Sequence, residues 1–293
     1  MKILHLMAGL SEASGVANVA RRFVRVQTEH GDEAVLLAPA FKWNPIYFGP
    51  LFAFKALWHV RSADQVWVHC SWTFPVWYGA FLAKVFGKKL IVVPEGSFDP
   101  MRLNNHARWK KRLVMPLDRW VLRWADEVLA LCPAEIGWVE GFEPSAKVRF
   151  ERVPVFYPEH PRFPAIGTRS APLRVLFLGR AQDPLKGVRY LERAIAGMKD
   201  GVELRIESEV FGEEKEKAWA WCDVLCLPSL SENFGLVVAE ALEHGKRVIT
   251  TDGAPAWKDQ PGVTWLEGFV AASDTQRIEL LENALNMHCR AIS

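Results

Sequence analysis

The sequence predicts an α/β protein of two Rossmann-like domains, each built on a parallel sheet. Short apolar runs alternate with longer segments of helical spacing along most of the 293 residues. Strand, helix and strand in succession imply parallel strands with covering helices. One proline-rich segment without periodicity interrupts the alternation. It divides the chain into a first domain at 1–153, a linker at 154–172 and a second domain at 173–293.

The first domain is predicted from short apolar runs that are bounded by turn residues, as buried strands are. These runs are "KILHLM", "EAVLLAP", "QVWVHC" and "KLIVVPE". Two segments of helical spacing, "VANVARRFVRVQTEHG" and "TFPVWYGAFLAKVFG", end at Gly31 and Gly87, which we interpret as C-caps. "ADEVLALCPAEIGWVEGF" adds one more strand and helix.

The linker and the second domain follow in the same way. Proline removes backbone donors and fixes φ, so the segment predicts an extended linker; its prolines are Pro154, Pro158, Pro161, Pro164 and Pro172. The predicted strands after it are "LRVLFLG", "VELRIE", "DVLCLPS" and "KRVITTD". The predicted helices are "VRYLERAIAGM", "KEKAWAWC" and the segment that contains "GLVVAEALEHG".

Composition limits the class of protein. The net charge is only +2, which does not indicate a nucleic-acid partner. Five cysteines without paired spacing favour a reduced, cytoplasmic protein over a disulfide framework. The first apolar run is short and has no cleavage box, so we expect a strand and not a signal peptide. The longest apolar stretch, "WNPIYFGPLFAFKALWHV", is broken by Pro45, Pro50 and Lys55, so we expect no transmembrane helix.

Ligands bind open parallel sheets at the carboxyl ends of the strands. The loops expected there are "AGLSEASG", "HCSWTFP", "PEGSFDP", "LGRAQDPLKG" and "PSLSENFG". Neither domain has G-x-G-x-x-G between its first strand and helix, and "EAVLLAP" lacks an acidic end that would hold a ribose. The loops therefore disfavour a nicotinamide enzyme.

Two cations, Arg180 and Lys186, fall at the end of the second domain's first strand. They suit a diphosphate, through bidentate guanidinium contact and an ammonium point charge. Solvated loop charges are the alternative. The amides from Phe234 to Leu236 precede a helix and are placed to bind an anion.

Two glutamates, Glu232 and Glu240, lie in the mostly apolar segment "SENFGLVVAEALEHG". Glu232 has a structural alternative, since a first-turn acid favours the helix dipole. Glu240 lies one turn beyond Leu236 and Val237, among apolar neighbours. A buried carboxylate there needs donors, and a ribose would supply two hydroxyls.

These segments together resemble a known family. "LPSLSENFGLVVAEALEHGKRVITTDGAP" is similar to the donor-site signature of retaining GT-B glycosyltransferases, with the E-x7-E spacing met by Glu232 and Glu240. "FLGRAQDPLKG" resembles the family's diphosphate loop. "DQVWVHCSW" and "VVPEGSFDPMRLNNHARWKKRL" resemble segments of bacterial lipopolysaccharide and exopolysaccharide glycosyltransferases. The resemblance implies a GT-B fold, with two Rossmann-like domains facing a central cleft.

The resemblance also implies an activity. The protein would be a retaining glycosyltransferase of the hexosyltransferase type, acting in cell-surface polysaccharide or lipopolysaccharide synthesis. It would move a sugar from a nucleotide-diphosphate donor to a glycan or lipid-linked acceptor. No metal or other cofactor is expected, and the sequence has neither a D-x-D pair nor a histidine cluster.

The resemblance assigns a role to each matching residue. Arg180 and Lys186 would neutralise the leaving diphosphate, where charge develops in the transition state. Glu232 would hold the transferred sugar, and His69 would face it, although a strand-end histidine bonded to a carbonyl is the alternative. The catalytic assignments are Glu232, His69, Arg180 and Lys186. The donor-binding assignments are Gly15, Glu95, Arg180, Lys186, Asn233, Phe234, Gly235, Leu236 and Glu240.

The sequence departs from the family pattern at several points. Of the family's double glycine only Gly15 is present, after Ser14. The gap from Arg180 to Lys186 is one residue longer than usual. Glu95 stands where a histidine or arginine is common. The second domain is short between "VELRIE" and "KAWAWC", where the family has a longer base-recognition region, so the sequence does not identify the nucleotide base of the donor. A catalytically weakened sugar-nucleotide-binding or scaffold protein is the alternative function.

A basic, tryptophan-rich stretch, "RLNNHARWKKRLVMPLDRWVLRW", has a second interpretation. Basic amphipathic helices can lie on anionic lipid. The alternative is that the tryptophans pack inside while the cations stay solvated. On the first interpretation the protein is peripheral on the inner face of the cytoplasmic membrane, and its membrane-facing residues are Arg108, Trp109, Lys110, Lys111 and Arg112.

Overall fold

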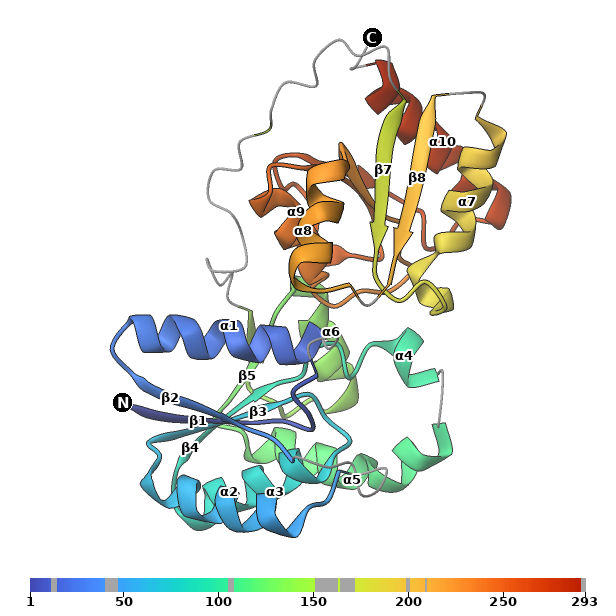
Figure 1. Cartoon of the computed structure of the whole chain (residues 1–293). Coiled ribbons are helices and arrows are strands. Elements are labelled where there is room, and N and C mark those ends of the chain that lie inside the picture. Colours follow the sequence, from blue (N-terminus) through green and yellow to red (C-terminus); the bar gives the residue numbers. More distant parts are fainter. Residues whose placement is uncertain are drawn as a thin grey trace. The chain divides into compact units, whose positions relative to one another are not determined.

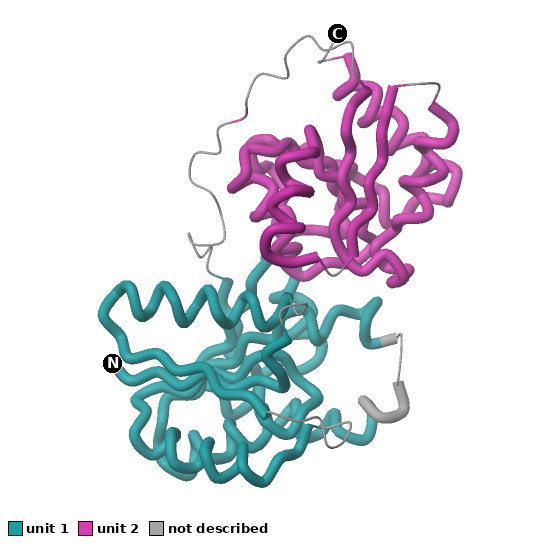
Figure 2. The backbone as a smooth tube through the Cα atoms, in the orientation of Figure 1, with its two compact units in different colours: residues 1–155 teal, residues 156–293 magenta. Residues whose placement is uncertain are grey.

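The computed structural model describes residues 1–11, 15–39, 47–104, 108–150, 163, 172–198, 201–208 and 210–290, without the side chains of 104 and 108–111. The chain divides into two compact units, Met1–Val155 and Phe156–Ser293 (Figure 2). The predicted linker at 154–172 lies outside the described residues except for Phe163 and Pro172. Ser14 of the predicted glycine loop lies outside them too.

The first unit contains a six-stranded sheet in the order β2-β1-β3-β4-β5-β6, and its strand pairs are parallel. All carboxyl ends therefore meet at one edge, where the loops after β1, β3 and β4 lie together. The strands are β1 (Lys2–Leu6), β2 (Glu33–Leu37), β3 (Gln65–His69), β4 (Lys89–Val93), β5 (Glu127–Ala130) and β6 (Val148–Phe150).

Helices cover both faces of this sheet. α1 lies on one face, and α2, α3 and α5 lie on the other (Figure 1). The main core forms on the second face, where Leu4, Leu6, Val66 and Val68 of the sheet pack against these helices. The helices are α1 (Gly15–Glu29), α2 (Pro50–Ser62), α3 (Phe74–Val85), α4 (Pro100–Asn104), α5 (Arg108–Trp124) and α6 (Pro133–Phe142).

The second unit contains a five-stranded parallel sheet in the order β11-β10-β9-β7-β8. Its strands are β7 (Leu173–Leu178), β8 (Val202–Glu207), β9 (Val224–Leu227), β10 (Arg247–Thr251) and β11 (Val263–Leu266). Its helices are α7 (Val188–Gly197), α8 (Gly212–Trp221), α9 (Leu236–Glu243) and α10 (Asp274–Arg290). Helix pairs α7–α10 and α8–α9 cover opposite faces (Figure 1).

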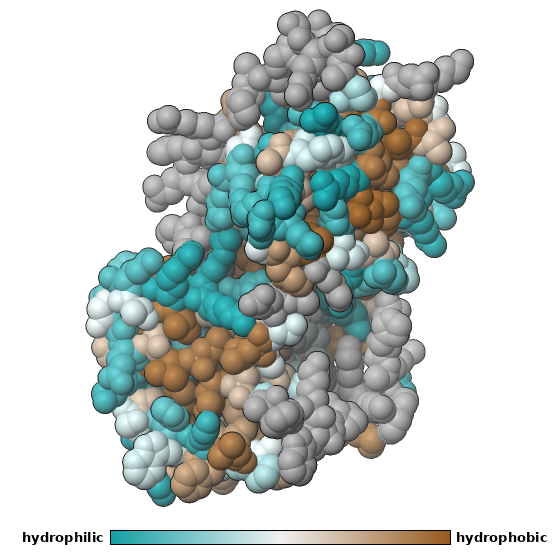
Figure 3. Space-filling view, viewed as in Figure 1, coloured by the Kyte–Doolittle hydropathy of each residue, from teal (hydrophilic) through white to brown (hydrophobic). Residues whose placement is uncertain are grey.

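The predicted α/β class with two parallel sheets is confirmed, and each predicted strand coincides with an observed one. Helix α2 was not predicted, since Pro45, Pro50 and Lys55 served only to exclude a transmembrane helix. Pro50 occupies the first turn of the helix, where a missing N–H costs nothing. Among the described residues, no helix is both long and apolar enough to cross a bilayer. Hydrophobic residues nevertheless gather on the visible surface of the first unit (Figure 3).

Candidate active site

Two loops of the second unit lie against each other at the carboxyl edge of its sheet. One follows β7 and carries Lys186; the other follows β9 and carries Glu232. Leu230 donates its amide to the carbonyl of Leu185 at 2.7 Å. Gly187 has φ +66°, and a Cβ there would overlap the carbonyl oxygen of Pro228, so only glycine allows this approach.

Lys186 and Glu232 form an ion pair across these two loops. Their side chains are 13% and 8% exposed, so the pair is nearly removed from solvent. The Ser229 hydroxyl donates to the same carboxylate oxygen at 3.1 Å. The Glu232 amide donates to the carbonyl of Gly253 at 2.7 Å. The carboxylate is therefore fixed by side-chain and backbone contacts.

Arg180 has a different environment in the same loop. Its guanidinium donates to Asp183 at 3.1 Å and is 59% exposed. The other oxygen of Asp183 accepts the amide of Leu185 at 3.1 Å and caps the short 3₁₀ turn Pro184–Lys186. Both predicted diphosphate cations thus lie in one loop, and each has a carboxylate partner.

The start of helix α9 is held by its neighbours. Gly235 is the N-cap residue, with φ +69° in the left-handed region. The indole N–H of Trp257 donates to the carbonyl of Phe234, and the two rings lie 5.0 Å apart. The first turn of α9 therefore begins at the carboxyl edge, beside the Lys186–Glu232 pair.

Glu240, one turn into α9, has a partner that the sequence did not indicate. Lys215 of α8 lies 2.7 Å from its carboxylate, and the two side chains are about one-fifth exposed. The partly buried carboxylate is thus neutralised by an ammonium group. Its predicted role in holding ribose hydroxyls stays a prediction.

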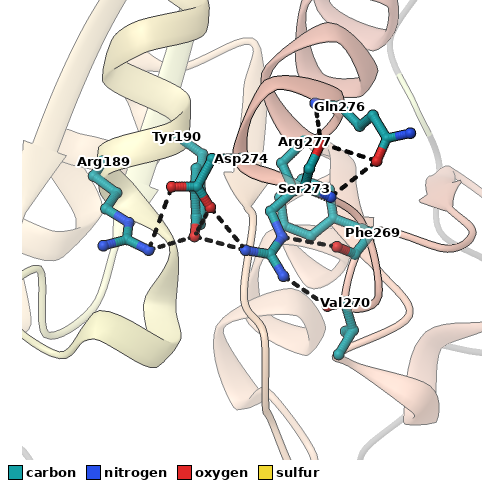
Figure 4. Close-up of polar contacts among 8 residues, drawn as sticks. All are labelled: Arg189, Tyr190, Phe269, Val270, Ser273, Asp274, Gln276 and Arg277. Atoms are coloured by element: carbon teal, nitrogen blue, oxygen red, sulfur yellow. Dashed lines mark hydrogen bonds and ion pairs between the residues drawn. The ribbon is translucent and has the colours of Figure 1, made fainter.

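A polar cluster ties α7 to α10 beside this edge (Figure 4). The buried Tyr190 donates its hydroxyl to Asp274 at 2.9 Å and accepts from Arg277 at 2.7 Å. Arg277 also donates to the carbonyls of Phe269 and Val270, at 2.9 and 2.6 Å. The loop after β11 is thereby fixed in place. The cluster supports the edge that carries the site.

In the first unit, a chain of hydrogen bonds runs through the sheet's α1 face. His69, the last residue of β3, contacts His5 of β1 with 2.8 Å between Nε2 and Nδ1. His5 Nε2 lies 2.7 Å from Gln27 Oε1, and His69 Nδ1 lies 2.7 Å from Glu95 Oε1. Both imidazoles are fully buried, and the Glu95 side chain is 3% exposed.

Burial determines the protonation states of the hydrogen-bonded side chains His5, His69 and Glu95. It lowers the pKa of His69 to about 3 and, together with the neighbouring ring, the pKa of His5 to about 3. Burial also raises the pKa of Glu95 well above its usual range. With Gln27 Oε1 as acceptor, His5 donates from Nε2, His69 donates from Nε2, and His69 Nδ1 accepts the Glu95 proton. The protons thus point one way, from Glu95 to His69, from His69 to His5 and from His5 to Gln27, and each neutral ring has one donor and one acceptor contact.

The loop after β3 is held by a hydrogen bond to Asp118 of α5. Cys70 and Trp72 both have positive φ, 66° and 68°, which side-chain-bearing residues rarely adopt. Asp118 Oδ1 accepts the amide of Trp72 at 3.0 Å. Burial raises the pKa of Asp118 to about 7, although the Trp72 hydrogen bond acts to lower it. A buried carboxyl therefore holds a strained loop beside His69.

Comparisons with known protein families agree with this geometry. A model of the glycosyl transferase 4-like domain matches residues 24–155, and a model described as glycosyl transferases group 1 matches residues 162–286. Together they span both units. Both units are glycosyltransferase domains. A search of curated protein sequences gave no match.

Solved structures show that the two glycosyltransferase domains have the GT-B architecture. Anabaena HepE in complex with UDP and glucose has a TM-score of 0.66 and 14% identity, covering 100% of this chain and 92% of that one. WaaG, a glycosyltransferase involved in lipopolysaccharide biosynthesis, has a TM-score of 0.66, 13% identity and coverages of 100% and 92%. WaaB, a lipopolysaccharide outer core galactosyltransferase, has a TM-score of 0.64 and 15% identity, covering 99% of this chain and 91% of that one.

The fold of this glycosyltransferase brings most of the predicted site residues to the two carboxyl edges. Lys186 and Glu232 are in contact, while Arg180 and Glu240 have separate partners. Gly15 is the first residue of α1. Asn233, Phe234, Gly235 and Leu236 form the entry to α9. Of the predicted membrane residues, Arg112 is exposed, and the side chains of 108–111 lie outside the description.

Sequence reasoning missed His5, Gln27, Lys215 and Asp118. A signal existed only for His5, a histidine within the apolar run "KILHLM". The others depend on partners far away in the sequence: Lys215 on Glu240, and Asp118 on Trp72. Among the described residues, no group of three or more histidine, cysteine or acidic side chains could hold a metal ion.

Proposed function

We propose that this glycosyltransferase moves a sugar from a nucleoside-diphosphate donor to a glycan or lipid-linked acceptor, with retention of configuration. The observation that carries the proposal is the meeting of the Lys186 and Glu232 loops at the carboxyl edge of the second sheet. The relatives support it: HepE was solved with UDP and with UDP-glucose, and WaaG is involved in lipopolysaccharide biosynthesis. We place the function in cell-surface polysaccharide or lipopolysaccharide synthesis.

The diphosphate would replace carboxylates as the partner of the two cations. Lys186 and Arg180 are paired with Glu232 and Asp183. As the sugar–phosphate bond breaks, negative charge grows on the leaving phosphate, and both cations would stabilise it. Because these side chains supply the positive charge, the proposed reaction uses no metal and no other cofactor.

The transferred sugar would lie against Glu232 and the backbone of Asn233 to Gly235. Glu232 is suited to accept sugar hydroxyls because Ser229 and the Gly253 carbonyl already fix its position. Retention would follow from attack of the acceptor on the face that the diphosphate leaves. In the first unit, we propose that His69 and Glu95 shape the sugar side of the site, with His5 and Gln27 setting their protonation.

Glu240 would exchange Lys215 for the ribose hydroxyls of the donor. Few residues would be available to recognise the nucleotide base of the donor, since only residues 208–211 connect β8 to α8. We therefore expect weaker discrimination between UDP-, GDP- and ADP-sugars than a longer connection would give. This assignment also explains why an acidic residue lies on the inner side of α9.

Thermal shift with UDP-, GDP- and ADP-sugars tests the donor class. A ligand at 100 times its Kd adds about 2.7 kcal/mol to the free energy of unfolding. Release of nucleoside diphosphate from the selected donor then tests turnover. No stabilisation by any nucleotide sugar would contradict the proposed function.

Substitutions locate the site. Lys186→Ala and Arg180→Ala should each slow turnover about 100-fold, since one lost preorganised donor raises the barrier by about 3 kcal/mol. Lys217→Ala, which removes an exposed cation of α8, is the matched control. Glu240→Ala should weaken nucleotide binding while the protein stays folded. Activity within a few-fold of wild type in both cation variants would refute the diphosphate assignment.

The second candidate function is a sugar-nucleotide-binding or scaffold protein that has lost turnover. The short connection of residues 208–211 between β8 and α8 favours it, because little of the second unit is left there to recognise and orient the donor base. The two functions differ in one measurement. Both predict stabilisation by a donor, but only the enzyme releases nucleoside diphosphate from it.

A further inference from the structure

Helix α2 has an apolar face that points to solvent. Leu51, Phe54 and Trp58, spaced as one helix face, are 63%, 67% and 68% exposed. The opposite face of the helix, with Phe52, Ala56 and Val60, is buried in the core. A surface helix normally has polar residues on its outer side. The outer face of α2 is therefore suited to a partner that accepts large apolar side chains.

The apolar surface continues onto the neighbouring helices. α3 packs against both α2 and α5, and all three cover the same face of the sheet (Figure 1). Phe81 and Val85 of α3 and Leu113 and Leu117 of α5 are exposed. We name the outer side of these three helices the α2–α3–α5 surface. Exposed apolar residues in such number on one side mark an interaction site.

The ionisable side chains of these three helices are nearly all basic, although Lys84 pairs with Asp126 and Arg123 with Glu143 beside the helices. α2 and α3 contain no acidic residue, and the single one in α5, Asp118, is buried. The whole chain is nearly balanced, with 36 lysines and arginines against 34 acidic residues, so the asymmetry is local. The cations of the three helices are Lys55, Arg61, Lys84, Arg108, Lys110, Lys111, Arg112, Arg119 and Arg123.

We propose that the α2–α3–α5 surface docks on an anionic lipid bilayer, with Leu51, Phe54 and Trp58 inserted at the level of the headgroups. Lys55 and Arg61, on the same exposed side of α2, would bind lipid phosphates. Interfacial helices combine large apolar side chains with lysine and arginine, as this one does. A second copy of the chain fits less well, because a two-fold contact would bring identical cationic surfaces together.

This surface includes α5, which contains the predicted membrane stretch at 108–112, and adds α2 and α3 to it. It lies on a helix layer of the first unit and not at the carboxyl edge of that unit's sheet. The proposal does not rest on sugar transfer. A non-catalytic protein with this surface would bind the same vesicles.

Co-sedimentation of the full chain with vesicles tests the docking. Vesicles of phosphatidylcholine with 30% phosphatidylglycerol should bind the protein at least tenfold better than pure phosphatidylcholine, with a steep loss at raised salt. Equal binding to both compositions, or to neither, overturns the proposal.

The triple variant Leu51→Ser, Phe54→Ser and Trp58→Ser should bind anionic vesicles at least tenfold more weakly, since three apolar side chains no longer insert. Met287→Ser, an exposed apolar residue of α10 at 65% exposure, is the matched control and should bind as wild type. Lys55→Gln with Arg61→Gln should bind several-fold more weakly and depend less on salt. Wild-type binding by the triple variant overturns the proposal.

Hydrogen exchange of the wild-type chain gives a readout without any substitution. Anionic vesicles should protect amides of residues 50–62 and leave those of 274–290 unchanged. Protection of the second region instead, or loss of a stable dimer in the triple variant without loss of vesicle binding, would assign the α2–α3–α5 surface to another role.

Discussion

The two carboxyl edges of this protein hold titratable groups in opposite ways. In the first unit, His5, His69 and Glu95 are almost completely buried and uncharged. In the second unit, Lys186 and Glu232 are also largely buried, at 13% and 8% exposure, but they form an ion pair. A fully desolvated charge costs several kcal/mol, so the first unit protonates its acid and deprotonates its histidines. The second unit keeps its charges because each one lies beside an opposite charge.

The loops differ in the same way. The second unit turns its loops at glycines, Gly187 and Gly235, both with positive φ. The first unit uses Cys70, Trp72 and Glu95 in that region, which costs about 1 kcal/mol or more for each. Asp118 accepts the amide of Trp72, His69 accepts the Glu95 proton, and the Cys70 amide donates to the carbonyl of Val93, so each residue is held in place. The site loops of the first unit therefore contain strained backbone, while those of the second unit avoid strain by having glycine at the corresponding turns.

The largest effect should come from Gly187→Ala. The new Cβ would overlap the carbonyl oxygen of Pro228, which is backbone and cannot rotate away. Together with the positive φ, we expect a loss of about 3 kcal/mol in the free energy of unfolding. Denaturant unfolding of the full chain measures it. Gly31→Ala, at a positive φ with open space around it, is the control for φ alone and should lose about 1 kcal/mol. Equal losses would mean that the loops do not need this close approach.

The same substitution, glutamate to glutamine, should separate the two edges. Glu232→Gln leaves the Lys186 ammonium nearly buried without a counter-charge, so we expect a loss of about 2 kcal/mol. Glu95→Gln should cost less than about 1 kcal/mol, because the amide can donate to His69 Nδ1 as the protonated acid does. Glu267→Gln, in an exposed pair with Lys258, is the control. A loss of 2 kcal/mol or more for Glu95→Gln would show that Glu95 is ionised.

The sequence predicted the strands well because apolar runs and turn residues are local signals. The position of the loop residues could be predicted from the strands, because parallel strands bring successive loops, such as those of Lys186 and Glu232, to one edge of the sheet. Helix α2 was missed since its exposed apolar residues hide the amphipathic pattern. The Glu240 partner was missed because Lys215 lies on another helix. Long-range pairing of polar groups leaves no pattern in a single sequence.

The pH dependence of stability should distinguish the acids from the histidines. Between about pH 6.5 and 3 the unfolded chain protonates His5 and His69 while the folded chain does not, so stability is lost as pH falls. Asp118 acts in the opposite direction. With a folded pKa of about 7 against about 4 unfolded, it holds an extra proton in the folded state over that window.

Asp118→Asn removes the Asp118 part of the opposing contribution, while Glu95, whose pKa burial also raises, keeps its part. The free energy of unfolding of the variant should therefore fall more steeply than that of wild type between pH 6.5 and 4.5, by up to about 1.4 kcal/mol per pH unit. Denaturant unfolding at several pH values measures the slope. An unchanged slope would mean that Asp118 is ionised in the folded protein throughout this range.

The smallest effect should come from Gln27→Ala, at the far end of the neutral chain. Gln27 accepts the hydrogen bond from His5 Nε2 at 2.7 Å and is only partly buried, so water can take its place. We expect a loss of about 1 kcal/mol, the net contribution of one hydrogen bond. ¹⁵N NMR of the histidine rings gives the decisive readout. In wild type, His5 and His69 should both carry their single proton on Nε2 and keep it unchanged from pH 8 to 5. In the variant both rings should keep this tautomer, because Glu95 still fixes His69 and the His69 Nε2 proton still requires His5 Nδ1 as its acceptor. A doubly protonated His69 at pH 7 would refute the neutral chain, and with it the contrast between the two edges.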